Sequence, residues 1–242
     1  MTLGIMQPYF LPYIGYFQLM DKCTKWVIFD CDQYKDKGWV NRNRILHPNF
    51  NKEWQFISIP ISNKKQFSKI DELIIFNEYD WKSEILGKFS FYKKKAKFYN
   101  EALEILKKIL NYNSENLALF IENSIKIISS YLEINCKILN QREIFESLIN
   151  KNNFKAGDWA LEITKLLNED KYINPIDGVK LFDINKFNKF NIKLYKFESS
   201  LSNYNQLNDT FVNKLSILDY IAWNGRVRTV EEIKKGKVTH VY

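Results

Sequence analysis

Two segments near the N-terminus carry the side chains best suited to chemistry. Residues 7–16 read QPYFLPYIGY, and residues 30–44 read DCDQYKDKGWVNRNR. Carboxylates can accept or orient protons, and arginine and lysine bind phosphates. Amides bind hydroxyl groups, and aromatic rings stack on a base or a sugar. Together these side chains suit an anionic ligand that is rich in hydroxyl groups.

Asp30 and Asp32 are the candidate catalytic residues. Asp30 ends the apolar run KWVIF, residues 25–29. A carboxylate there can act as a general base, or it can simply cap a loop. Cys31 between them is a possible nucleophile, but no histidine lies near it in the sequence, so no catalytic role is assigned to it.

The first candidate substrate-binding residues are polar or aromatic and lie in the same two segments. An extended backbone over residues 39–44 would place Trp39, Asn41 and Asn43 on one face and Arg42 with Arg44 on the other. We expect the first face to meet the ligand, with Arg42 either clamping a phosphate or lying at the surface. The set in these two segments is Gln7, Tyr9, Tyr13, Gln33, Lys37, Trp39, Asn41, Arg42 and Asn43.

The first 80 residues are expected to supply the strands that position these segments. Apolar runs predict strands over residues 3–6, 25–29 and 54–61, with another possible over 71–76, a helix starting near Gly15, and a loop over 31–44. Loops that follow strands are where α/β folds bind ligands.

The middle of the chain is expected to be helical. Helices are predicted over 81–96, 99–110, 115–133 (with Ser114 as N-cap), 141–150 and 157–168. A strand or loop at 171–175, a strand at 192–197 and a helix at 215–222 follow, the last ended by Asn224-Gly225. The basic tail, 226–242, is expected to be poorly ordered.

The predicted fold class is therefore α/β. It has an N-terminal mixed or doubly wound sheet and a mainly helical middle and C-terminal part. We expect one domain over residues 1–242, with a strand-rich ligand-binding part (1–80), a helical part (81–170) and a closing strand and helix (171–242).

Composition restricts the class of protein. The chain has 242 residues, 45% hydrophobic and 26% charged, which is typical of a globular protein. No apolar run approaches the ~20 residues of a membrane span, and the N-terminus lacks the basic start of a signal peptide. Three cysteines without a CxxC pair favour the reducing cytoplasm. Two histidines exclude a His-rich metal site, and no metal is expected. The net charge of +8 suits a nucleic acid, an acidic membrane surface or a phosphorylated substrate.

Residues 5–46, IMQPYFLPYIGYFQLMDKCTKWVIFDCDQYKDKGWVNRNRIL, resemble the opening signature of the WbqC-like family. The segments FISIP (56–60), YINPIDGVKLF (172–182) and LSILDYIAWNG (215–225) resemble its later blocks. The chain departs from the pattern where the family has two successive acids and this chain has Asp30-Cys31. It departs again where Lys-Arg precedes the glycine and this chain has Asp36-Lys37.

The resemblance implies a role in surface polysaccharide synthesis, including O-antigen. Such genes are often linked to dideoxy amino sugars whose amine carries an acyl or aminoacyl group. The implied activity is a transferase that acylates or aminoacylates the amine of a nucleotide-linked deoxyamino sugar. Asp30 would act on the amine, Arg42 and Lys37 would hold phosphate, and Trp39 and Tyr9 would stack. The match of the last block adds Asp219 and Asn224 to the site.

No phosphate-binding glycine loop or adenylation motif is visible in the sequence. The donor is therefore expected to arrive preactivated, as an acyl-CoA, an aminoacyl-tRNA or a carrier thioester, and no tightly bound cofactor is expected. Two other functions remain open: a non-catalytic nucleotide-sugar or glycan-binding partner of the same pathway, and a basic RNA-binding protein. A homodimer is the default assembly.

Overall fold

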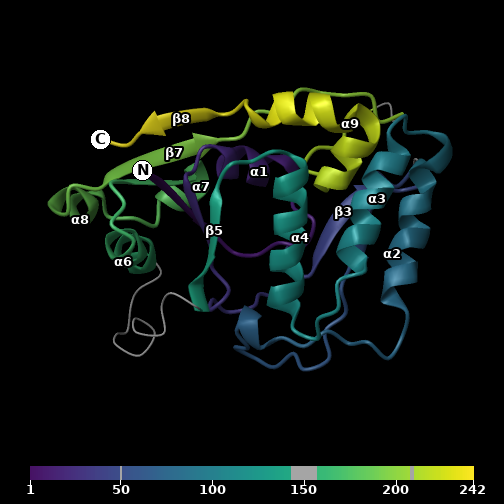
Figure 1. Cartoon of the computed structure of the whole chain (residues 1–242), viewed down its shortest axis with the longest axis horizontal. Helices are drawn as coiled ribbons and strands as arrows, with labels where there is room; N and C mark the ends of the chain where they lie inside the picture. Colours follow the sequence, from purple (N-terminus) through teal and green to yellow (C-terminus); the bar gives the residue numbers. More distant parts are fainter. Residues whose placement is uncertain (50, 143–156, 208–209) are drawn as a thin grey trace.

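The structure is a computed structural model that describes residues 1–49, 51–142, 157–207 and 210–242 (Figure 1). Its main sheet has six strands in the order β5–β2–β1–β6–β7–β8, and β8 alone runs antiparallel to its neighbour. The strands are β1 (Thr2–Met6), β2 (Lys25–Ile28), β5 (Lys137–Asn140), β6 (Lys171–Pro175), β7 (Lys193–Glu198) and β8 (Lys237–His240).

The order of the five parallel strands creates a switch point. From β1 the chain moves outward on one side through β2 and β5, and then returns to the other side of β1 for β6 and β7. The connections therefore leave β1 and β6 in opposite directions. In doubly wound sheets this divergence opens a crevice at the carboxyl ends of the strands, where ligands bind.

Helices cover both faces of the sheet, and the strand side chains alternate between them. Trp26 and Ile28 of β2 join a core with α1 (Ile14–Asp21), α4 (Leu117–Tyr131) and α9 (Ile217–Ile233). Val27, between them, joins a second core with α6 (Asp158–Leu166) and α8 (Ile184–Lys189). Figure 1 shows α6 and α8 on one side of the sheet and α1 and α4 on the other. The α/β class is thus confirmed.

The remaining elements extend the first core. β3 (Arg42–Leu46) and β4 (Trp54–Ser58) form a separate antiparallel pair. They are followed by the 3-10 helix η1 (Ile70–Glu72), α2 (Trp81–Phe89), the 3-10 helix η2 (Ser90–Lys94) and α3 (Tyr99–Leu110). The short α7 (Ile176–Val179) follows β6 directly.

Several local predictions are confirmed, and others are corrected. The strand expected over 71–76 is wrong: η1 and isolated bridges at Ile74 and Ile75 replace it, because this run bonds to separate loops. The loop over 31–44 ends earlier, at β3. The helix over 81–96 stops at residue 89. The N-cap of α4 is Asn116, whose side chain accepts from Leu119 N, and not Ser114. The helix over 141–150 lies outside the described residues, apart from 141–142.

The C-terminal predictions are confirmed in part. The break expected at Asn224-Gly225 is present, because Gly225 has non-helical backbone at φ 72° and ψ 177°, but a second helical stretch follows it within α9 and runs to Ile233. The tail is ordered: residues 226–233 are helical, and β8 pairs with β7. Pairing with β7 provides partners for the backbone hydrogen-bonding groups of β8, a segment whose composition alone favours disorder.

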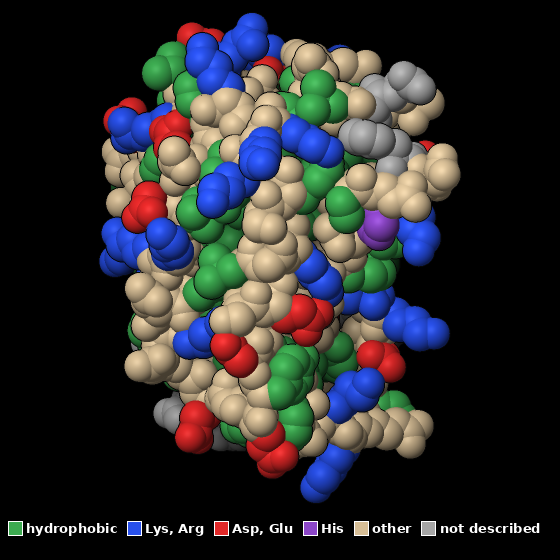
Figure 2. Space-filling view, turned by 90° about the vertical axis from the view of Figure 1, so that its right-hand side faces the viewer, with side chains coloured by type: hydrophobic (Ala, Val, Ile, Leu, Met, Phe, Trp, Pro, Cys, Tyr) green, Lys and Arg blue, Asp and Glu red, His purple; other side chains and the backbone are tan. Residues whose placement is uncertain are grey.

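In the described part of the chain, no helix combines the length and apolarity needed to cross a membrane. Figure 2 shows one face of the molecule, on which lysine and arginine side chains are scattered among acidic and apolar ones. A continuous basic stripe, as expected for an RNA-binding surface, is not visible on this face.

Gln18 on α1 joins three segments, and its replacement provides a first prediction. The buried amide donates to the carbonyls of Ser200 (2.6 Å) and Glu232 (2.9 Å) and accepts from Ser199 Oγ (2.7 Å). Gln18→Met keeps the size and helix propensity but leaves these groups without partners. We expect the free energy of unfolding to fall by about 2 kcal/mol in urea denaturation.

Gln55→Met is the matched control. The half-buried Gln55 amide donates one bond, to Leu46 O at 3.2 Å. Its loss should cost no more than about 1 kcal/mol. Equal losses in the two variants would contradict the role given to Gln18.

Candidate functional site

Three hollows meet at the carboxyl ends of β1, β6 and β7, beside the switch point. Their volumes are about 480, 230 and 180 Å³. Tyr13 and Lys214 line both of the larger two, while Met6 and Tyr9 connect them to the smallest. We call this combined space the carboxyl-edge groove. A larger hollow of about 710 Å³ lies against α9, but the groove occupies the position where folds of this strand order bind ligands.

The start of α1 forms one wall of the groove. Its N-cap, Tyr13, has extended backbone and no side-chain cap bond, and no acid lies in the first turn. The helix thus has no side chain of its own that caps its first amide groups, which is the arrangement that can bind an anion. Glycine is required at position 15, because a Cβ there would lie 2.3 Å from the Tyr13 ring and 2.6 Å from Ser199 Oγ. Lys214 adds a positive charge to the same hollow.

Two carboxylates lie in this hollow as well. Asp177 follows β6, and Glu198 is the last residue of β7. Burial raises the pKa of Tyr13, and the charge of Asp177 raises it further, so the phenol stays protonated at neutral pH. The groove therefore combines an anion-attracting end with carboxylates that can bind an amine.

Gln7 and Asp32 connect the groove to the second predicted segment. Gln7 lines the smallest hollow, and its Nε2 donates to Asp32 Oδ2 at 2.5 Å. The pKa of Tyr9 is raised by burial, by Tyr13 and by Asp32. Asp32 is partly exposed. It is thus an accessible carboxylate held beside the groove.

Asp30, by contrast, has no exposed surface. Its Oδ2 accepts from Arg142 Nε at 2.8 Å and lies 3.5 Å from Asn140 Nδ2, which also donates to Glu122 Oε2 at 2.5 Å. Burial raises the Asp30 pKa to about 6, opposed by Arg142 and assisted by Asp71 and Glu122. Asp30 therefore anchors the ends of β2 and β5 and does not itself face the groove.

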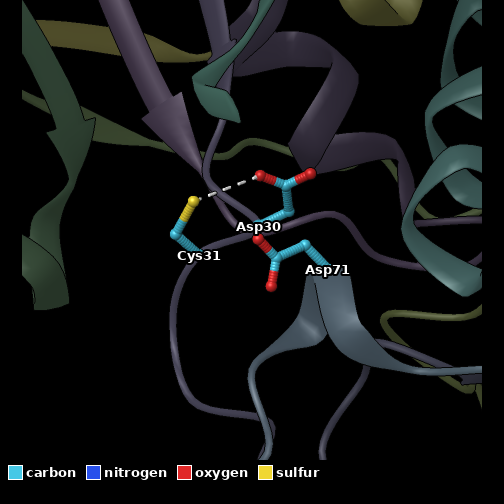
Figure 3. Close-up of side chains that lie close together, drawn as sticks. All are labelled: Asp30, Cys31 and Asp71. Atoms are coloured by element: carbon cyan, nitrogen blue, oxygen red, sulfur yellow. Dashed lines mark hydrogen bonds between the residues drawn. The ribbon is translucent and has the colours of Figure 1, made fainter. Parts of the chain in front are cut away.

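Asp30, Cys31 and Asp71 form the one group in the described residues that could hold a metal ion, with ligand atoms within 4.8 Å of one another (Figure 3). The chemistry opposes a metal. Burial raises the pKa of the Cys31 thiol to about 12, and Arg142 already binds Asp30. A protonated thiol is a weak ligand and a weak nucleophile.

The structure uses the asparagines of the second segment internally. Asn41 accepts from Tyr34 OH (2.9 Å) and donates to Ile59 O (2.7 Å). Buried Asn43 donates to the carbonyls of Phe10 (3.1 Å) and Leu11 (2.9 Å) while bordering the groove. The Asn43 amide therefore holds the two segments together and reaches the candidate site, whereas the Asn41 amide joins the second segment to the end of β4.

Of the other predicted residues of that segment, only Trp39 lines the groove. Arg42 lies over the Phe56 ring at 4.2 Å and donates to Gly38 O at 3.1 Å, so it braces its own loop. Trp39 is 40% exposed and lines the groove. Lys37 and Gln33 are exposed; Lys37 accepts a bond from Arg42 through its carbonyl, and Gln33 forms a bridge with Lys69.

Asp219 and Asn224 lie away from the groove. Asn224 lines the 710 Å³ hollow, and Asp219 is buried beneath it. Asp219 is fully buried and accepts from Tyr92 OH (2.6 Å) and Tyr204 OH (2.5 Å). Burial raises its pKa to about 6, partly offset by the tyrosine hydrogen bonds. Asn224 lines the hollow and donates to Tyr220 O at 3.0 Å. The predicted site residues thus belong to two places in the fold.

The sequence analysis missed Asp177, Glu198 and Lys214. Glu198 directly follows the predicted strand 192–197, and Asp177 lies two residues after the predicted strand or loop 171–175, so the rule that ligands gather after strands could have found them. Nothing in the local sequence distinguishes Lys214 from other lysines.

Comparisons with known proteins agree over most of the chain. The model of the WbqC-like protein family matches residues 7–231. A protein of Mycobacterium tuberculosis (strain ATCC 25618 / H37Rv), named only as uncharacterized, is 27% identical over 222 residues, covering 90% of this chain and 92% of that protein. No solved structure matches the chain.

Proposed function

The chain belongs to the WbqC-like protein family, and from this premise we propose that it acylates or aminoacylates the amine of a nucleotide-linked deoxyamino sugar. The acceptor binds in the carboxyl-edge groove. The activated donor is an acyl-CoA, an aminoacyl-tRNA or a carrier thioester.

One observation carries the proposal: the 480 Å³ hollow at the switch point contains groups for both ends of such an acceptor. The start of α1 and Lys214 suit its phosphates, and Asp177 and Glu198 suit its amine. The volume lies within the range typical of ligand pockets. Tyr9, Tyr13 and Trp39 supply ring surfaces for the base and the sugar.

The reaction needs one proton acceptor. An amino sugar arrives as an ammonium ion and must transfer a proton to a base before its nitrogen can attack. The neutral nitrogen then attacks the acyl carbon of the donor. A C–N bond forms and the donor's C–S or C–O bond breaks. The leaving group takes up the second proton released by the nitrogen.

Asp32 is the base in this proposal, because it is the accessible one of the two predicted catalytic carboxylates and is bound by Gln7, which lines the smallest hollow of the groove. Asp30 is a positioning residue. Its carbonyl accepts from Asp71 N (3.0 Å), and the Asp32 carbonyl accepts from Ile70 N (3.0 Å), so both residues fix this loop against η1.

Asp32→Asn tests the proposal. Turnover of an amine-bearing nucleotide sugar with acyl-CoA or aminoacyl-tRNA should fall about 100-fold, since a general base typically contributes at least that factor. Kd for the sugar, measured by calorimetry with UDP-, GDP- and dTDP-linked sugars with and without an amine, should change little.

Asp36→Asn is the control, because Asp36 lies on the same loop but is exposed and pairs with Lys64 at 3.1 Å. It should retain full turnover. Unchanged turnover in Asp32→Asn would exclude Asp32 as the base. Sugar binding without product under any donor would favour a binding partner over a transferase.

A further inference from the structure

The 710 Å³ hollow against α9 has a composition distinct from that of the groove. It lies between α9, the residues that precede α3, and segment 202–207. Figure 1 shows α9 beside α1 and against one end of α3, and α9 packs against both helices. Asn224, which the sequence analysis placed in a site, lines this hollow and not the groove.

Positive charge dominates its walls. Glu232 is matched within the protein: its Oε2 binds Lys235 Nζ at 2.7 Å, and its Oε1 accepts from Ser202 N at 2.8 Å. Counted as formal charges, the lining has four cations, Lys95, Lys97, Arg228 and Lys235, and two carboxylates, Glu231 and Glu232, which is an excess of two positive charges. Such a balance attracts a phosphate group.

Fixed aromatic rings form another part of the lining. Tyr204 and Tyr220 pack edge to face at 4.7 Å, and Trp223 lies beside them in the lining. The hydroxyl of Tyr204 is held by buried Asp219 at 2.5 Å. Tyr220 is buried and supports the other two rings, whereas Tyr204 and Trp223 are partly exposed and can stack on a base at a low entropic cost.

We propose that this hollow is a second ligand site, and that it binds a phosphorylated nucleoside. The base lies against the partly exposed rings of Tyr204 and Trp223, and the phosphate lies near Lys97 and Arg228. The volume is within the range of ligand pockets, and the amides of Asn203, Asn205 and Asn224 offer partners for the base and ribose.

The second site and the groove share one wall. Ser199 and Leu201 line the groove, and Ser202 lines the second hollow. Gln18 holds this wall at Ser199 and Ser200, and Glu232 holds it at Ser202. If the chain has the proposed function, this nucleoside is part of the donor molecule. It is then the phosphorylated adenosine of CoA or the terminal adenosine of an aminoacyl-tRNA. This assignment rests on the proposed function, whereas nucleoside binding does not.

Calorimetry on the full chain tests the site with ADP, CoA, uncharged tRNA and inorganic phosphate. ADP should bind more tightly than inorganic phosphate, and the double variant Lys97→Glu/Arg228→Glu should weaken ADP binding at least tenfold. Lys108→Glu, an exposed charge reversal on α3, should leave it unchanged. CoA binding without tRNA binding identifies the small donor, and the reverse identifies tRNA.

A competition experiment separates this inference from the proposed function. With ADP at saturation, Kd for an amine-bearing nucleotide sugar should stay the same, because the two ligands occupy different sites. Loss of sugar binding under ADP would overturn the second site. So would equal ADP affinity in the double variant and the wild type, or the absence of binding by ADP, CoA and tRNA. ADP binding that persists when no acyl transfer is found would overturn the proposed function alone.

Discussion

Gly225→Ala is expected to lower the free energy of unfolding by about 3 kcal/mol. Gly225 lies at φ 72° and ψ 177°, a backbone region that is essentially restricted to glycine. A Cβ there would also lie 2.7 Å from the Phe98 ring. Backbone strain and overlap in a packed core each cost about 1–3 kcal/mol. Thermal unfolding should shift downward by about 10 °C for a chain of this size.

Gly87→Ala is the matched control. Gly87 lies inside α2, and a Cβ there meets nothing within 4 Å. Alanine is the better helix former, so this variant should gain about 1 kcal/mol. The same substitution thus has opposite signs at two helical glycines. A stable Gly225→Ala protein would show that the α9 kink is not needed. That result would also weaken the case for the second hollow, which both halves of α9 line.

The stability of the protein is expected to fall as the pH rises from about 4 to about 6. Burial raises the pKa of Asp219 to about 6, and that of Asp30 also to about 6. A raised carboxyl pKa means that the folded state binds more protons than the unfolded state between these pH values. Each shift of about two pKa units corresponds to about 3 kcal/mol, present below about pH 4 and lost above about pH 6.

Urea denaturation at pH 4, 5, 6 and 7 measures this dependence. Asp219→Asn should remove a large part of the decrease between pH 4 and 6, since the amide does not titrate. The measurement compares how steeply the free energy of unfolding changes with pH. Its absolute value is not compared, because it also depends on the altered hydrogen bonds to Tyr92 and Tyr204. Asp36→Asn should leave the slope unchanged, because Asp36 is exposed and its lowered pKa acts only at more acid pH. A wild-type slope in Asp219→Asn would refute the assignment.

Local patterns were sufficient for the elements of the fold that depend on neighbours in the chain. The run KWVIF became β2, and the spacing of apolar residues over 115–133 became α4. The position of Gln7 and Asp32 after strands placed them at the edge of the sheet, where the structure joins them. These outcomes follow from side-chain periodicity and from the rule that parallel strands end together.

The tertiary structure alone decided which carboxylate is accessible. Asp30 and Asp32 lie two residues apart, yet Arg142 and the surrounding core bury the first and leave the second beside the groove. No local pattern separates them, because burial depends on segments more than 100 residues away along the chain.

The groove and the ordered C-terminus were decided in the same way. Glu198 and Lys214 reach the start of α1 only because β7 returns to the far side of β1. Residues 237–240 form β8 only because the edge of β7 supplies their hydrogen-bond partners. Local sequence therefore determined the elements and several candidate residues, whereas strand order determined the site, because pairing and burial are contacts between distant parts of the chain.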